Sequence, residues 1–115
     1  MNNIPISNKI PELDLAIKAA EEAGNIILKI YEKGFKTFTK TDNSPVTDAD
    51  LQSNKIIKEI LSVTKYSILS EEDVDDKNRL SNDMIWIIDP LDGTSDFIDK
   101  TGEFTVMIAL VENQK

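Results

Sequence analysis

Hydrophobic side chains recur every three or four residues along two stretches of the chain, which is the spacing of one helix face. The first stretch covers residues 12–33, and Pro11 and Gly34 suit its first helical position and its C-terminal cap. The second stretch follows Thr47, and Asp50, three residues later, completes the pattern of a capping box. The pattern therefore predicts two amphipathic helices, each with an apolar face for a core.

Shorter apolar runs between turn-forming residues predict strands. These runs are residues 35–40, 66–69, 84–88 and 104–111. The last run is apolar on both sides, so we expect it to lie inside a sheet that is covered on both faces. Residues 42–45 form a turn signal, and the polar, acidic stretch 74–82 predicts a loop. This order of helices and strands favours an α+β layered architecture.

Length and composition indicate a single soluble domain. The chain has 115 residues, 40% of them hydrophobic and 30% charged, which is enough for one modest core. We expect an N-terminal arm over residues 1–11 and one folded part over residues 12–115. No apolar run approaches the roughly 18 residues of a membrane helix, and the N-terminus lacks the features of a signal peptide, so we expect a cytoplasmic protein.

Net charge and two missing residue types restrict the chemistry. With 21 acidic and 13 basic residues the formal net charge is -8, which disfavours binding to nucleic acids. The sequence has no cysteine and no histidine, which excludes disulfides, cysteine nucleophiles, a Ser-His-Asp triad and histidine-ligated zinc within the chain. Any chemistry must use carboxylates, hydroxyls, lysines, backbone groups and hard metal ions.

A buried strand leads directly to residues 89–94, Asp-Pro-Leu-Asp-Gly-Thr. Asp92 follows Asp89 by three residues, so one turn can direct both carboxylates at a shared cation such as magnesium, manganese or calcium. Gly93 lets the backbone approach a ligand, and the N–H groups of Gly93 and Thr94 open a short helix that could hold a phosphate. Such a segment alone is more often a surface turn, but the strand running into it favours a site.

Two other segments carry clustered polar groups. Residues 70–73, Ser-Glu-Glu-Asp, follow a predicted strand, and their adjacent acids repel one another unless water or a cation neutralises them. A solvated loop and a metal site explain this segment equally well. Residues 44–50, Ser-Pro-Val-Thr-Asp-Ala-Asp, are typical of a helix N-cap, although a carboxylate there could also orient a hydroxyl or a water.

Taken together and in this order, the three segments resemble the inositol monophosphatase superfamily of magnesium-dependent, lithium-sensitive phosphatases. Residues 96–98 and 102–106 are similar to its 3'(2'),5'-bisphosphate nucleotidase branch, which removes a phosphate from 3'-phosphoadenosine 5'-phosphate. The resemblance runs from about Leu13 to the C-terminus. It implies the N-terminal half of the inositol monophosphatase-like (sugar phosphatase) fold, with two long helices packed on a largely antiparallel sheet.

The resemblance also implies roles for individual residues. The metal ligands would be Glu71, Asp89, the Leu91 carbonyl and Asp92. Asp89 would bridge two metals, and the complete enzyme would hold two or three Mg²⁺ ions, with Mn²⁺ as an alternative. Thr94 would orient the attacking water, and Asp50 would accept the threonine's hydroxyl proton. The backbone N–H groups of Gly93 and Thr94 would bind the phosphate of a small phosphorylated metabolite. Metal-activated water needs neither cysteine nor histidine.

The sequence departs from the superfamily in two respects. Its members are substantially longer, and their second half supplies a further aspartate for the metal site and most contacts to the substrate. We therefore expect residues 12–115 to be the metal- and phosphate-binding part of a phosphatase domain, inactive alone and able to self-associate through apolar strand faces. Ser95 stands where the nucleotidase branch usually has lysine, and Lys100 or Lys36 could supply that charge.

Three alternatives stay open at this point. Inositol monophosphatase or sugar bisphosphatase activity would fit the same superfamily. A non-catalytic module that binds metal or phosphate and needs a partner would fit the shortness of the chain. A haloacid-dehalogenase-type phosphatase fits less well, because its two aspartates are two residues apart, whereas Asp89 and Asp92 are three apart.

Overall fold

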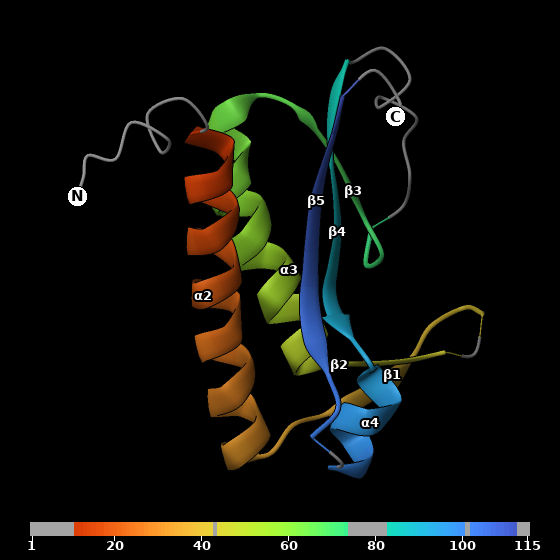
Figure 1. The fold of residues 1–115 in the computed structure, drawn as a ribbon. Helices are drawn as coiled ribbons and strands as arrows, with labels where there is room; N and C mark the ends of the chain where they lie inside the picture. The colour runs from red at the N-terminus through yellow and green to blue at the C-terminus, as the bar shows by residue number, and fades with distance from the viewer. Residues whose placement is uncertain (1–10, 43, 74–82, 101, 113–115) are drawn as a thin grey trace.

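The computed structural model describes residues 11–42, 44–73, 83–100 and 102–112. Two long helices lie side by side on one face of a three-stranded sheet, and a two-stranded hairpin projects at the end where the middle strand leads into a short helix (Figure 1). The elements are α2 (Pro11–Lys33), β1 (Thr37–Thr39), β2 (Pro45–Thr47), α3 (Asp48–Leu61), the 3-10 turn η1 (Ser62–Thr64), β3 (Ser67–Ser70), β4 (Met84–Asp92), α4 (Thr94–Asp99) and β5 (Thr105–Glu112).

Both predicted helices are confirmed, together with their caps. Helix α2 begins at Pro11, and Gly34 follows its last residue with a φ of 103° and donates its N–H to the Ile30 carbonyl (2.9 Å). At α3, Thr47 is the N-cap and Asp50 completes the capping box. None of the described helices combines the length and apolar character that crossing a membrane requires.

The sheet has the order β3-β4-β5 and is mixed. Strand β4 runs parallel to β3 and antiparallel to β5, and the separate hairpin β1–β2 is antiparallel. Two of the three strand pairs are therefore antiparallel, as the expected fold requires. The parallel pair decides where the site lies, because the carboxyl ends of β3 and β4 meet at the same edge of the sheet.

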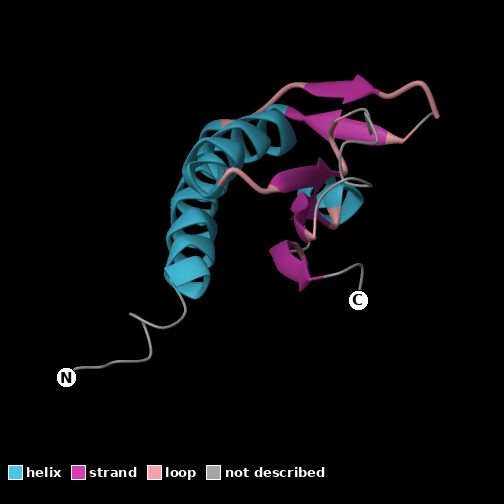
Figure 2. Ribbon diagram, turned by 90° about the horizontal axis from the view of Figure 1, so that it is seen from above, coloured by secondary structure: helices cyan, strands magenta, loops and turns pink. Residues whose placement is uncertain are grey.

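The main core lies between the sheet and the two long helices, which Figure 2 shows as separate layers. Its buried members are Ala19 and Ala23 of α2, Ile57 and Leu61 of α3, and Trp86 and Ile88 of β4. The indole Nε1 of Trp86 donates to the hydroxyl of Thr64 (3.1 Å), so its one polar atom is satisfied. Helices on one side and a sheet on the other confirm the α+β layered architecture.

Three expectations about strands need correction. In the described part of the chain, the outer face of the sheet is open, since Ile87 is 41% and Met107 54% exposed, so β5 is covered on one face only. Strand β4 does not end at residue 88 but continues to Asp92, with an irregularity in its pairing after Asp89. The segment after the turn at 42–45 is strand β2, which pairs with β1.

Two further expectations concern the ends of predicted segments. Strand β1 covers only the central part of the predicted run 35–40. Pro11 belongs to a helix rather than to the arm, because it can occupy the first helical position without losing a hydrogen bond. The rest of the arm, residues 1–10, and the predicted loop 74–82 lie outside the described residues.

Candidate functional site

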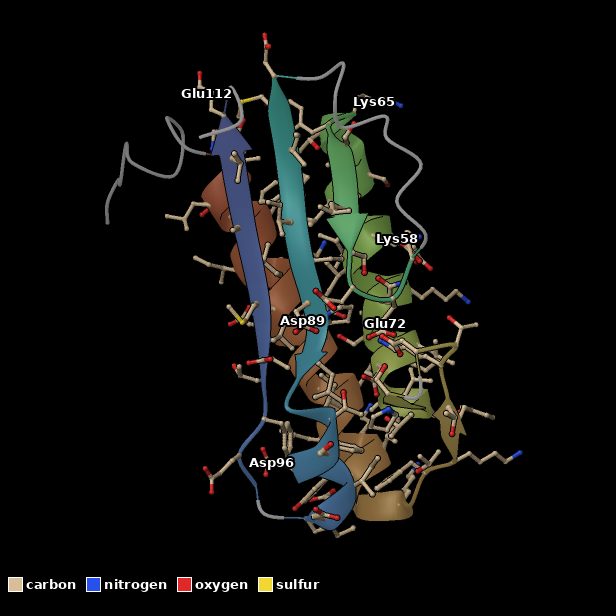
Figure 3. All side chains as sticks on the ribbon, turned by 90° about the vertical axis from the view of Figure 1, so that its right-hand side faces the viewer. Lys58, Lys65, Glu72, Asp89, Asp96 and Glu112 are labelled. Carbon is tan, nitrogen blue, oxygen red and sulfur yellow. The ribbon has the colours of Figure 1, made fainter. Side chains whose placement is uncertain are left out.

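A cleft of about 490 Å³ lies where β3 and β4 end. Ser70, the last residue of β3, pairs with Ile88 in the parallel register, so Glu71 follows β3 next to Asp89 of β4, and the Glu71 N–H donates to the Ile88 carbonyl (3.2 Å). The cleft is lined by Lys40, Thr41, Asp42, Ser44, Pro45, Glu71, Glu72, Asp89, Leu91, Asp92, Gly93, Thr94 and Ser95. Figure 3 shows Asp89 and Glu72 at the same level of the sheet, the first from β4 and the second from the turn after β3.

This lining contains every residue that the sequence assigned to metal or phosphate. Asp50 does not line the cleft but contacts it through a hydrogen bond from the Thr94 hydroxyl to its Oδ1 (2.8 Å). Asp50 is fully buried, and its Oδ2 accepts from the backbone N–H (2.8 Å) and the hydroxyl (2.7 Å) of Thr47. One carboxylate therefore both caps helix α3 and holds the hydroxyl of Thr94.

The direction of the Thr94 hydroxyl matters for its chemistry. A hydroxyl has one proton to donate, and the Asp50 oxygen at 2.8 Å is a nearer acceptor than the Leu91 carbonyl at 3.3 Å. With its proton directed at Asp50, Thr94 presents oxygen lone pairs as acceptors. Such an oxygen can hold a water molecule by accepting one of the water's protons.

The start of α4 depends on a glycine. Gly93 has a φ of 93°, which favours glycine, and a Cβ at this position would lie 2.7 Å from the Glu103 carbonyl oxygen. Helix α4 is anchored by Phe97, whose side chain is completely buried. Its ring packs against the rings of Tyr31, Phe35 and Phe104 at centroid distances of 4.7–5.2 Å. The position of the Gly93 and Thr94 amides thus rests on an aromatic cluster that the sequence pattern did not reveal.

The carboxylates of the cleft perturb one another. Burial raises the pKa of Asp89, and the charges of Asp92 and Glu71 raise it further, against a backbone hydrogen bond from Leu91 N–H (3.3 Å). A divalent cation would offset this repulsion, and carboxylate and carbonyl oxygens are the ligands that magnesium prefers. The donor set therefore fits a hard cation. As the side chains stand, however, no group of three acidic residues in the described ranges is arranged to hold a metal ion.

Two charged residues of the cleft were not predicted as a pair. Lys40 Nζ lies 3.1 Å from Glu72 Oε1, and the Glu72 side chain is only 4% exposed. Burial lowers the pKa of Lys40, but the ion pair with Glu72 and the charges of Asp50 and Glu71 outweigh burial, and the pKa is raised. Burial also raises the pKa of Glu72, against the effect of Lys40. At Glu72, burial together with the charges of Asp50 and Asp89 outweighs the contact with Lys40, so the pKa of this carboxyl is raised.

The lysine that lines the cleft is Lys40, and not Lys36 or Lys100 as the sequence suggested. Ser95 is exposed at its rim. Neither Lys36 nor Lys100 belongs to the lining, and Lys100 Nζ instead donates to the Tyr31 carbonyl (2.8 Å). Recognition of the β1–β2 hairpin in the sequence would have predicted that Lys40 lies beside Ser44. The Lys40 N–H donates to the Ser44 carbonyl (2.8 Å) across the turn that joins the two strands.

Helices on one face of a mixed sheet, with acidic residues and a hydroxyl gathered at one edge of the sheet, define a layered α+β domain with an acidic site. Comparison with known proteins makes this specific: a model of the inositol monophosphatase family matches residues 9–115. The chain belongs to the inositol monophosphatase family.

Among its relatives, the chain is 42% identical over 105 residues to the 3'(2'),5'-bisphosphate nucleotidase CysQ of Buchnera aphidicola, covering 87% of this chain and 40% of that protein. The crystal structure of CysQ from Bacteroides thetaiotaomicron has 48% identity and a TM-score of 0.75, over 90% of this chain and 38% of that one. The IMPase of Thermotoga maritima has 28% identity and a TM-score of 0.77, over 90% and 40%. The chain thus spans about two fifths of the length of these relatives.

Proposed function

We propose that this chain forms the metal- and phosphate-binding part of a magnesium-dependent, lithium-sensitive phosphomonoesterase that removes the 3'-phosphate of 3'-phosphoadenosine 5'-phosphate. The observation that carries the proposal is the gathering of Glu71, Asp89 and Asp92 around one cleft that also includes Thr94, bonded to buried Asp50. The similarity to CysQ proteins, at 42% and 48% identity, supports the nucleotidase branch within the superfamily.

The acidic residues would hold the metal. Glu71, Asp89, the Leu91 carbonyl and Asp92 line the cleft and offer only hard oxygen donors. Magnesium bound there would neutralise phosphate charge and acidify a coordinated water. Asp89 would take the bridging role, because burial and then the charges of both Asp92 and Glu71 raise its pKa.

The remaining residues would position the reactants. Thr94, with its proton directed at Asp50, would accept a hydrogen bond from the attacking water and hold it for in-line displacement. The N–H groups of Gly93 and Thr94, at the positive end of α4, would bind the phosphate. Lys40, which pairs with Glu72 and lines the same cleft, would add the positive charge of its ammonium group.

The test is a phosphate-release assay with magnesium on the chain alone and on the chain mixed with the C-terminal part of a CysQ relative. Substrates are 3'-phosphoadenosine 5'-phosphate, inositol 1-phosphate and fructose 1,6-bisphosphate, with lithium as inhibitor. We expect little or no release by the chain alone and nucleotide-selective release by the mixture. Asp89→Asn should abolish that release. Asp99→Asn, which removes the same group from an exposed position outside the cleft, should not.

Preference for an inositol or sugar phosphate would move the assignment to another branch of the family, as the similarity to the Thermotoga IMPase allows. A second class of function has its own support. No three acids of the described part are arranged to hold a metal ion, so a non-catalytic binding module is the competing proposal. Inactivity of the mixture despite Mn²⁺ binding by the chain would favour this module. Activity unchanged by Asp89→Asn would refute the site assignment.

A further inference from the structure

An asparagine of helix α3 contacts both ends of the turn that carries Glu71 and Glu72. Asn54 is 8% exposed, and both ends of its amide are used. Its Oδ1 accepts from the Ser70 hydroxyl (2.6 Å), and its Nδ2 donates to Oδ1 of Asp73 (3.0 Å). Ser70 and Asp73 are the first and last residues of the acidic turn, so the amide spans the two glutamates.

Neighbouring contacts complete this attachment. Asp73 places its other carboxylate oxygen 2.7 Å from the ammonium of Lys58, one helical turn beyond Asn54 on α3. Ser70, which is 4% exposed, accepts the Glu72 backbone N–H at its Oγ (3.2 Å). Figure 3 shows Lys58 and Glu72 on this side of α3. The backbone of the turn is therefore held at both ends, while Glu71 and Glu72, between these ends, line the cleft.

The same turn of α3 also contacts β4 next to Asp89. Ser53, adjacent to Asn54 and fully buried, donates its hydroxyl to the Pro90 carbonyl (2.7 Å). Pro90 follows Asp89 directly. Two consecutive side chains of one helix thus bond to the last residue of β3, next to Glu71, and to the residue of β4 that follows Asp89. Rigid helices locate such groups more accurately than loops can.

We propose that Asn54 is a positioning residue for the acidic cleft, acting through Glu71; the inference rests on the proposed metal site. A buried amide needs partners wherever it lies, and a general contribution to stability would satisfy that need. A role in stability alone does not require both bonds to go to the same turn. Here the amide oxygen of Asn54 accepts from Ser70 at one end of the turn, and its NH₂ group donates to Asp73 at the other end. Removing the amide leaves the turn attached through the Asp73–Lys58 ion pair and the bond from the Glu71 N–H to the Ile88 carbonyl, so the Glu71 side chain is positioned less accurately in the cleft. Such supporting groups typically change metal affinity 10–100-fold.

The test compares Mn²⁺ binding, by electron paramagnetic resonance or calorimetry, with thermal unfolding of the same 115-residue protein. Asn54→Leu keeps the size of the side chain and removes both hydrogen bonds, and we expect about 10-fold weaker Mn²⁺ binding. Ser70→Ala removes the hydroxyl that donates to Asn54 and accepts the Glu72 N–H, but keeps the bond from Asn54 to Asp73. It should also weaken Mn²⁺ binding, and it serves if Asn54→Leu does not fold. The matched control is Ile57→Ala on the same helix, in the main core with Ala19, Ala23, Leu61, Trp86 and Ile88, which should unfold at lower temperature with unchanged Mn²⁺ affinity.

A double-mutant cycle with Glu71→Gln separates positioning from general stability. If Asn54 acts through Glu71, the Asn54→Leu effect on Mn²⁺ affinity should disappear in the Glu71→Gln background. Hydrogen exchange supplies a readout without metal, since the amides of Glu71 and Asp73 should exchange faster in Asn54→Leu. Unchanged Mn²⁺ affinity in folded Asn54→Leu or Ser70→Ala, with binding by the wild type, overturns this inference alone. A wild-type chain that binds no Mn²⁺ overturns the metal site and this inference with it.

Discussion

Replacing Asp50 by asparagine tests whether one carboxylate serves both the helix cap and the threonine of the cleft. The carboxylate accepts two hydrogen bonds from Thr47 on one oxygen and one from Thr94 on the other. An asparagine has one acceptor oxygen and one donor group. If its oxygen faces Thr47, its NH₂ group faces Thr94, whose hydroxyl must then turn toward the Leu91 carbonyl at 3.3 Å.

The expected magnitude follows from these bonds. Asp50→Asn removes the charge from the two bonds to Thr47 and reverses the third. We therefore expect the free energy of unfolding to fall by roughly 2–4 kcal/mol, because bonds to charged groups contribute about 1.5–3 kcal/mol and neutral ones about 0.5–1.5 kcal/mol. The matched control is Asp48→Asn, whose carboxylate accepts an exposed hydrogen bond from Lys36 N–H (3.1 Å) and should contribute less than about 1 kcal/mol.

Urea unfolding at neutral pH measures both variants, with the fluorescence of Trp86, the single tryptophan of the chain, as the probe. Trp86 is 1% exposed, so unfolding should shift its emission clearly. Equal losses for Asp50→Asn and Asp48→Asn would show that burial and the shared hydrogen bonds do not set Asp50 apart. The reasoning would also fail if Asp50→Asn kept full stability.

Three other outcomes can be measured on the same chain. Gly93→Ala should lower the free energy of unfolding by about 1–3 kcal/mol because of its positive φ and the nearby carbonyl, whereas Gly24→Ala, with nothing within 4 Å of the new Cβ, should raise it by about 0.5–1 kcal/mol. Asp89 has a raised pKa from burial and then from neighbouring acids, so without metal its charge opposes folding, and stability is recovered as pH falls through the raised pKa. Asp89→Asn should thus stabilise the chain at pH 7 in urea unfolding but have little effect below about pH 3.9. Met107→Lys, on the open sheet face, should shift concentration-dependent association toward monomer in sedimentation, and a wild type that is monomeric at all concentrations would contradict the expected self-association.

Much of the fold could be predicted because it is encoded locally. The periodicity of α2, its proline and glycine at the two ends, and the capping box of α3 all depend on neighbours within four residues. The buried strand leading to Asp89 is marked by its uninterrupted apolar run. The same local signals placed the site at a strand end, where layered folds commonly bind ligands.

The rest could not be predicted because it depends on contacts between distant residues. Strand β2 has three residues and exists through its pairing with β1, so neither propensity nor period marks it, and the place of Lys40 was missed with it. Asn54 and Ser53 look like ordinary polar positions of a helix until the ends of β3 and β4 meet them. The open face of β5 could not be inferred from an apolar strand, because burial is decided by what else packs there.

The charge of the cleft supports the proposed binding of a hard cation. Its lining carries five acidic residues and one lysine, and that lysine pairs with Glu72. Among the described residues no basic side chain forms an ion pair with Glu71, Asp89 or Asp92. Helix α3 bonds to Ser70 of β3 through the Asn54 amide and to Pro90 of β4 through the Ser53 hydroxyl, and these neutral groups leave the charges of Glu71 and Asp89 in place. The chain has no histidine or cysteine to offer a softer ligand. An oxygen-binding metal ion would relieve the remaining repulsion between the carboxylates. Part of the binding energy of that ion would then come from the loss of this repulsion.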